Sequence, residues 1–97
     1  MPTYISLLRF TEQGIKSIKD APSRVDAGRE TLRAMGSQLK DLYLVLGRYD
    51  LVTISEADDD EAAAKVALAI GSQGNVTTET MRAFTEDEYR RMASALP

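Results

Sequence analysis

Four polar residues interrupt a long apolar stretch near the middle of the chain. The tetrapeptide Gly47-Arg48-Tyr49-Asp50 separates an apolar run at 42–46 from another at 51–55, and the two runs are rich in Leu, Val, Ile and Tyr. Runs of this length and composition are typical of β-strands, and a glycine between them lets the backbone reverse direction. The sequence therefore predicts a β-hairpin at the centre of the fold.

The segments on either side of this hairpin predict alternating strands and helices. Residues 3–10 alternate partly between apolar and polar side chains, which indicates a first strand. Thr11 suits a helix start, and Pro22 favours a break between a short helix near 12–18 and a longer one near 22–35. Further strands are expected over 39–46, 51–57 and 76–84, a helix from the acidic run at 58–61 to Gly71, and a last helix from Thr85.

The predicted order of elements is β-α-β-β-α-β-α. Its first six elements match the ferredoxin-like arrangement, an α+β fold with a four-stranded antiparallel sheet and two helices. Because both crossover connections are right-handed, both helices lie on one face of the sheet and the other face stays open. At 97 residues the chain is expected to form a single domain, residues 1–97, with one hydrophobic core.

The composition removes several classes of function. The chain contains no cysteine and no histidine, so it lacks thiolate nucleophiles, the commonest general base and the commonest zinc ligands. A net charge of -3 gives no reason to expect nucleic acid or an anionic membrane as a partner. The N-terminal segment lacks the pattern of a secretory signal, and no apolar stretch approaches the ~20 residues of a membrane span. We therefore expect a cytoplasmic protein with no metal and no cofactor.

Several short motifs resemble the GYD domain family, whose name derives from a Gly-x-Tyr-Asp sequence at this hairpin. The resemblance implies a ferredoxin-like fold and a dimeric α/β barrel, in which two sheets pack face to face, but it implies no activity. The matching positions are Tyr4-Ile5-Ser6-Leu7, Thr11 with Gly14, Pro22 with Arg24, Gly47-Arg48-Tyr49-Asp50 with Val52, and Gly74 followed by Thr78 to Arg82.

The open face of the sheet is where a binding site is expected. If Val52 and Ile54 face the helices, then Thr53 and Ser55 face the open side. The last strand adds either the row of Thr78, Thr80 and Arg82 or the row of Thr77 and Glu79. Hydroxyls would then line this face and hydrogen-bond a small polar ligand inside a dimer. The candidate ligand-binding residues are Tyr49, Asp50, Thr53, Ser55, Thr78, Thr80 and Arg82.

The same face is expected to hold an apolar patch. Leu8 and Phe10 would form it together with Tyr43 and Val45. Because a soluble monomer rarely leaves a large apolar patch exposed, a second copy of the chain is expected to cover it. The sequence thus predicts a homodimer or a higher homo-oligomer.

Three functions are compatible with these features. The first, which we favour, is a non-catalytic homo-oligomeric module that binds a small molecule or assembles through the open face. The second is a cofactor-independent enzyme of oxygenase or isomerase type with an active site between subunits, in which Glu56 and Glu79 would act as acid and base if they meet. The third is a structural partner of another protein. The sequence assigns no catalytic residue.

Overall fold

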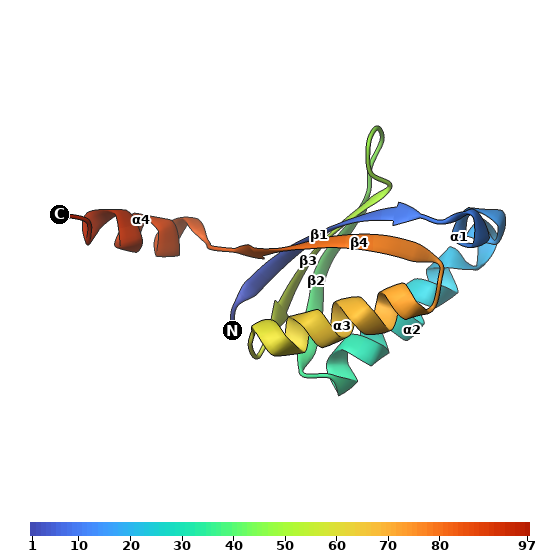
Figure 1. The fold of residues 1–97 in the computed structure, drawn as a ribbon, viewed down its shortest axis with the longest axis horizontal. Coiled ribbons are helices and arrows are strands. Elements are labelled where there is room, and N and C mark those ends of the chain that lie inside the picture. The colour runs from blue at the N-terminus through green and yellow to red at the C-terminus, as the bar shows by residue number, and fades with distance from the viewer.

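A computed structural model describes residues 1–97 as one antiparallel sheet with two long helices on one face (Figure 1). The strands lie in the order β2-β3-β1-β4, which confirms the ferredoxin-like α+β fold with an additional C-terminal helix. The strands are β1 (Thr3–Phe10), β2 (Ser37–Leu44), β3 (Leu51–Ala57) and β4 (Val76–Ala83). The helices are α1 (Glu12–Lys16), α2 (Ala21–Ala34), α3 (Asp60–Ser72) and α4 (Glu86–Ser94), with a short 3-10 helix over Ile18–Asp20.

The helices begin where the sequence provides caps. Asp59 Oδ1 accepts a hydrogen bond of 2.8 Å from the amide of Ala62 at the start of α3. Thr85 and Glu88 form a reciprocal capping box at the start of α4. The predicted break at Pro22 is confirmed, because the 3-10 helix separates α1 from α2 and Pro22 lies in the first turn of α2.

The central hairpin is confirmed with shifted boundaries. β2 begins at Ser37 because Gly36 adopts a φ of 77°, which reverses the chain directly after α2. β2 then ends at Leu44, and residues 45–50 form the connection to β3. Gly47, with a φ of 110°, supplies the left-handed conformation in this connection.

The pairing register shows which side chains share a face of the sheet. Ser6 lies opposite Thr53 on β3 and Thr80 on β4, and all three line the space beneath α2 and α3. Side chains alternate along a strand, so Ile5 and its partner Ile54 lie on the opposite, open face. The predicted orientation of the sheet is therefore wrong.

Two of the apolar side chains predicted for the open face also lie on the helix side of the sheet. Leu8 is buried beneath the helices, and Phe10 shares its side of β1, so neither belongs to the predicted open patch. Tyr43 does lie on the open face, opposite Val52, and Val45 lies in the loop beyond β2. Alternation could not decide between the two faces because both carry apolar side chains.

The chain on its own buries few side chains. Tyr4, Leu8, Leu32 and Ala57 form its buried hydrophobic core. Its accessible surface is 6626 Å², whereas a compact monomer of this mass exposes about 5500 Å². The excess of about 1100 Å² is larger than the roughly 800 Å² that each partner buries in a standard protein interface. The chain on its own therefore exposes more surface than a compact monomer of its mass.

Candidate functional site

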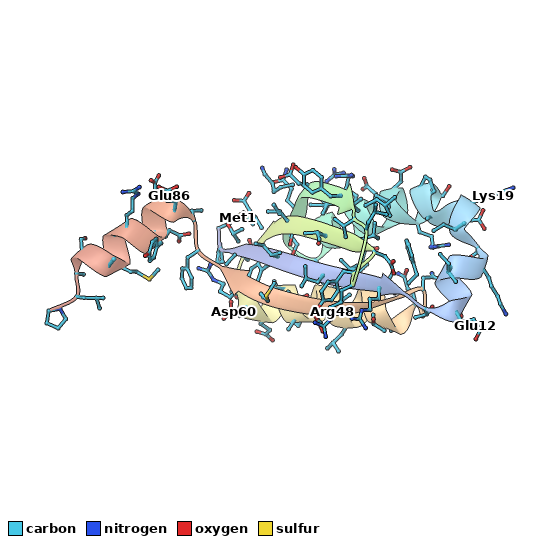
Figure 2. All side chains as sticks on the ribbon, turned by 90° about the horizontal axis from the view of Figure 1, so that it is seen from above. Met1, Glu12, Lys19, Arg48, Asp60 and Glu86 are labelled. Atoms are coloured by element: carbon cyan, nitrogen blue, oxygen red, sulfur yellow. The ribbon has the colours of Figure 1, made fainter.

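The open face of the sheet has an aliphatic centre, and no helix lies in front of it (Figure 2). Two cross-strand rows build it. We use "open face" for this whole side of the sheet. Its centre consists of Ile54, Ile5 and Met81 in one row and Tyr43, Val52 and Leu7 in the other, and Asp41 and Glu79 complete the two rows at opposite corners.

Tyr49 of the hairpin loop lies against one end of the open face. The guanidinium carbon of Arg9 is 5.0 Å from the centre of its ring, within the range of a cation–π contact. The pKa of the Tyr49 phenol is raised, mainly by hydrogen bonding to the Glu79 carboxylate and next by burial. Tyr49 therefore borders the open face, where β1 and β4 present Arg9 and Glu79.

Asp50 extends the ladder between β1 and β3. Its amide donates to the carbonyl of Leu8 at 2.9 Å, and its carbonyl accepts from the amide of Val45 at 2.9 Å. Its carboxylate Oδ2 accepts from the amide of Phe10, also at 2.9 Å. The carboxylate thereby replaces a strand carbonyl beyond the end of β3. These contacts engage Asp50 with backbone groups of the hairpin and of β1.

A cavity of about 150 Å³, which we call the interlayer cavity, lies between the sheet and the helices α2 and α3. Its floor is rich in hydroxyl groups, and Ser6 Oγ is hydrogen-bonded to Thr80 Oγ1 at 2.9 Å. Four predicted site residues meet here, on the helix side of the sheet and not on the open face. The hydroxyls of the floor belong to Ser6, Thr53, Ser55, Thr78 and Thr80, and the aliphatic roof includes Val25, Leu32, Val66 and Ile70.

Sequence reasoning placed no site at five polar residues that line this cavity. They are Arg24, which was named only as a family position, and Arg29, Ser37, Gln73 and Asn75. A signal for Arg29 was present, because it interrupts the apolar helix stripe of Val25 and Leu32 at the i+4 position. Ser37 carried no comparable signal. It is only 7 % exposed, and its Oγ has no hydrogen-bond partner.

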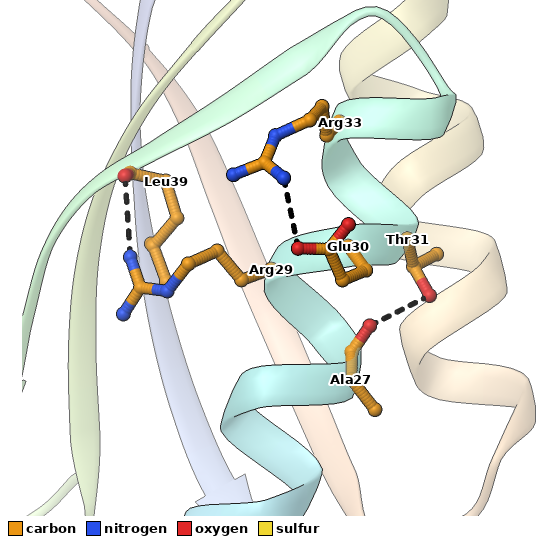
Figure 3. Close-up of polar contacts among 6 residues, drawn as sticks. All are labelled: Ala27, Arg29, Glu30, Thr31, Arg33 and Leu39. Atoms are coloured by element: carbon orange, nitrogen blue, oxygen red, sulfur yellow. Dashed lines mark hydrogen bonds and ion pairs between the residues drawn. The ribbon is translucent and has the colours of Figure 1, made fainter.

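The two arginines differ in how many hydrogen bonds their guanidinium groups donate. Arg24 donates to the carbonyl and the hydroxyl of Ser17, each at 3.0 Å, and to the carbonyl of Gly14 at 3.1 Å. It therefore ties α1 to α2. Arg29 reaches from α2 to β2 and donates a single long hydrogen bond of 3.5 Å to the carbonyl of Leu39 (Figure 3).

Arg82, the remaining predicted site residue, lies on the helix side of β4 opposite Tyr4. Its guanidinium carbon is 4.3 Å from the ring centre of Phe84 and 5.8 Å from that of Tyr4. Its Nη1 also donates to the carbonyl of Ala83. Arg82 thus packs between two aromatic rings next to the C-terminal arm.

Tyr4 makes the stability of the fold sensitive to alkaline pH. It is 3 % exposed and donates a 2.6 Å hydrogen bond to Asp60 Oδ1. Burial, followed by the contact with Asp60, raises the pKa of its phenol from 10.0 to about 12. Because the folded pKa exceeds the unfolded one, the neutral phenol stabilises the fold fully below pH 10, and this stabilisation is lost as the pH rises through 12.

We therefore expect the urea midpoint of unfolding to fall between pH 10 and 12 more steeply in the wild type than in Tyr4→Phe. Tyr89→Phe is the matched control, because Tyr89 is 65 % exposed and should keep the wild-type slope. Equal slopes for the wild type and Tyr4→Phe would contradict this assignment.

The carboxylates do not form an acid–base pair. Glu56 lies opposite Thr3 and Glu79 opposite Leu7, so they are separated along β1 although they share the open face. Glu56 Oε1 instead lies 3.5 Å from Lys40 Nζ. No group of three or more Asp or Glu side chains is placed to hold a metal ion. None of the helices has the length and hydropathy needed to cross a membrane.

Two comparisons of the sequence identify relatives. Residues 4–93 match the GYD domain family. The glutamine synthetase and cystathionine beta-lyase binding protein of Thermus thermophilus is 36% identical over 85 residues, which is 87% of this chain and 90% of that protein.

Solved structures share the fold. A crystal structure of a Thermus thermophilus protein is 31% identical with a TM-score of 0.57, and the match covers 88% of this chain and 95% of that one. The Mycobacterium tuberculosis leucine response regulatory protein has a TM-score of 0.65 at 17% identity, which is a likeness of fold alone. The match covers 87% of this chain but only 51% of the regulator. Because the family match extends over nearly the whole sequence and includes the Gly47-Arg48-Tyr49-Asp50 turn, the chain belongs to the GYD domain family.

Proposed function

We propose that this chain is a cytoplasmic, non-catalytic assembly module that forms a homodimer through the open face and binds a protein partner. The observation that carries the proposal is the aliphatic centre of that face. Ile5, Leu7, Val52 and Ile54 lie on the two inner strands, and the helices of the chain cover only the opposite side. Packing against a second sheet would remove these side chains from water.

α4 supplies a second uncovered apolar surface. Tyr89 and Met92 are 65 % and 43 % exposed, and their i, i+3 spacing places them on one side of the helix. Leu96, which is 72 % exposed, follows just beyond the end of the helix. Figure 1 shows α4 extending away from the body of the chain. A helix of 9 residues is marginally stable in water without packing. We propose that a second copy of the chain covers this apolar side.

A protein partner is supported by the relative from Thermus thermophilus. That protein is named for binding glutamine synthetase and cystathionine beta-lyase, and 36% identity over most of both chains supports a related role here. We propose that the dimer of this chain likewise binds an enzyme. In this proposal the module contributes binding surfaces and no chemical step.

The dimer is tested by placing a charge at the centre of the open face. Ile54→Lys is expected to raise the dimer dissociation constant at least about tenfold in sedimentation equilibrium, because an ammonium group at this position would lose hydration when the second sheet packs against it. Ala27→Lys, on the exposed outer side of α2, is the matched control and should leave the constant unchanged.

A second variant separates a loss of assembly from a loss of folding. Ile54→Thr keeps a β-branched side chain, so the strand should persist while the apolar contact weakens. We expect its dissociation constant to lie between those of the wild type and Ile54→Lys. A wild-type chain that sediments as a monomer, or a dimer that Ile54→Lys leaves intact, would rule out association through this face.

A further inference from the structure

The interlayer cavity has two chemically different sides. Its roof on α2 and α3 is mainly aliphatic apart from two arginines of α2. Its floor on the sheet carries hydroxyls among the aliphatic side chains of Leu8, Leu39, Leu42, Leu51 and Val76. Its volume of about 150 Å³ is that of an engineered cavity known to hold one benzene molecule. A molecule that suits both sides therefore combines a compact apolar body with a polar end.

The charge of the lining favours an anion. Arg24 and Arg29 are the only charged residues that line the cavity, and neither takes part in an ion pair of the chain. The donors of Arg24 are used by Ser17 and Gly14, whereas Arg29 makes one hydrogen bond at the limit of the distance range. A guanidinium with free donors beside an apolar cavity is suited to pair with a carboxylate.

The polar groups near Arg29 gather at the β2 side of the cavity. Arg29 contacts the carbonyl of Leu39, and Leu39 lies opposite Ser55 in the sheet. Ser37 precedes Leu39 by two residues on the same face, and its buried hydroxyl has no partner. An unsatisfied buried hydroxyl is unfavourable, so the Ser37 hydroxyl would gain from a hydrogen-bond acceptor. The chain supplies no such acceptor, and a bound ligand could supply one to both Ser37 and Arg29.

We propose that the interlayer cavity binds a small organic carboxylate with an apolar body of about six carbon atoms. The body lies beneath the aliphatic roof, and the carboxylate accepts hydrogen bonds from Arg29, Ser37 and Ser55. The cavity lies on the opposite side of the sheet from the open face. This binding is therefore independent of the proposed dimer interface, and each proposal fails or succeeds separately.

The experiment uses benzoate as the probe and benzamide as its uncharged counterpart. Benzoate, titrated into the millimolar range, should shift the backbone amide NMR signals of Ser37, Thr53 and Ser55 in a saturable manner. Benzamide should bind at least about tenfold more weakly, because it cannot form the charged pair with Arg29.

Two pairs of variants locate the site. Arg29→Met keeps the aliphatic stem and should weaken benzoate binding at least about tenfold, whereas Arg33→Met, whose side chain is exposed and pairs with Glu30 (Figure 3), should not. Ala67→Leu fills the cavity from α3 and should abolish binding while the fold is retained. Ala27→Leu adds the same atoms to an exposed position and should leave binding unchanged.

Four results would overturn the proposal. They are an absence of saturable benzoate shifts, equal affinity for benzamide, equal effects of Arg29→Met and Arg33→Met, or full binding to Ala67→Leu. Thermal unfolding of each variant, measured without the probe, shows that it is folded before binding is compared. Arg29→Gln replaces Arg29→Met should the latter fail to fold.

Discussion

Gly14→Ala is expected to lower the free energy of unfolding by about 2–3 kcal/mol, because a side chain at this position has no space. A Cβ atom at Gly14 would overlap the backbone carbonyl of Asn75. The same carbonyl accepts a hydrogen bond of 3.1 Å from the amide of Thr11, so it is held in place by β1 and α1. Relief of the overlap requires the α3–β4 loop to move away from α1. Chemical denaturation followed by circular dichroism measures the loss.

Gly71→Ala is the matched control for this substitution. Gly71 also lies in a helix, but a Cβ atom there would have no neighbour within 4 Å. Alanine has a higher helix propensity than glycine, so Gly71→Ala should stabilise the chain by about 0.5–1 kcal/mol. The two substitutions are thus expected to have opposite signs. A Gly14→Ala variant as stable as Gly71→Ala would contradict the close approach of α1 to the α3–β4 loop.

Asp50→Ala is expected to lower the free energy of unfolding by about 2 kcal/mol, because it removes a charged acceptor from a strand amide. The Phe10 amide donates to the Asp50 carboxylate at 2.9 Å, and no strand carbonyl replaces that acceptor beyond the end of β3. The backbone bonds of Asp50 to Leu8 and Val45 remain possible with alanine. The expected loss of unfolding free energy therefore comes from the side-chain hydrogen bond alone.

Asp50→Asn separates the hydrogen bond from the charge. Asparagine keeps an acceptor oxygen at the same position, so its cost should be below about 1 kcal/mol. Amide hydrogen exchange of Phe10 gives a local measurement, and exchange should accelerate in Asp50→Ala more than in Asp50→Asn. Unchanged protection of Phe10 in Asp50→Ala would show that the carboxylate does not hold the end of β1.

The family positions named from the sequence acquire structural reasons in the fold. Thr11 Oγ1 accepts the Gly14 amide at the start of α1, and Arg24 donates back to the Gly14 carbonyl. Asp50 completes the hairpin ladder, and Tyr49 lies against Arg9 at the border of the open face. These contacts stabilise the connections between neighbouring strands and helices. The fold therefore depends on the residues of these short motifs.

The helices and the hairpin were predictable because their signals are local. The cap at Thr85 and the Pro22 break depend on residues within one or two turns of each other, and both are present in the structure. The boundaries of β2 were less predictable. Its start depends on the turn at Gly36, and a β-bulge near Lys40 shifts its pairing.

The grouping of the strand hydroxyls was predictable, but the face of the sheet on which they lie was not. Thr53, Ser55, Thr78 and Thr80 do share one face, as their two-residue spacing along each strand requires. The sequence could not assign that face to the helix side, because each face of the sheet carries both apolar and polar residues. Ser37 and Arg29 entered the site only through the packing of α2 over β2.

By itself, the sequence determined the order of the elements, the hairpin around Gly47-Arg48-Tyr49-Asp50 and the family, since each depends on local backbone preferences or on a contiguous motif. Only the tertiary structure decided which face of the sheet is aliphatic and open and which encloses the hydroxyls. That choice is set by strand register and by the side on which α2 and α3 pack. Both are contacts between residues far apart in the chain, and a period of two along a strand is the same for either face.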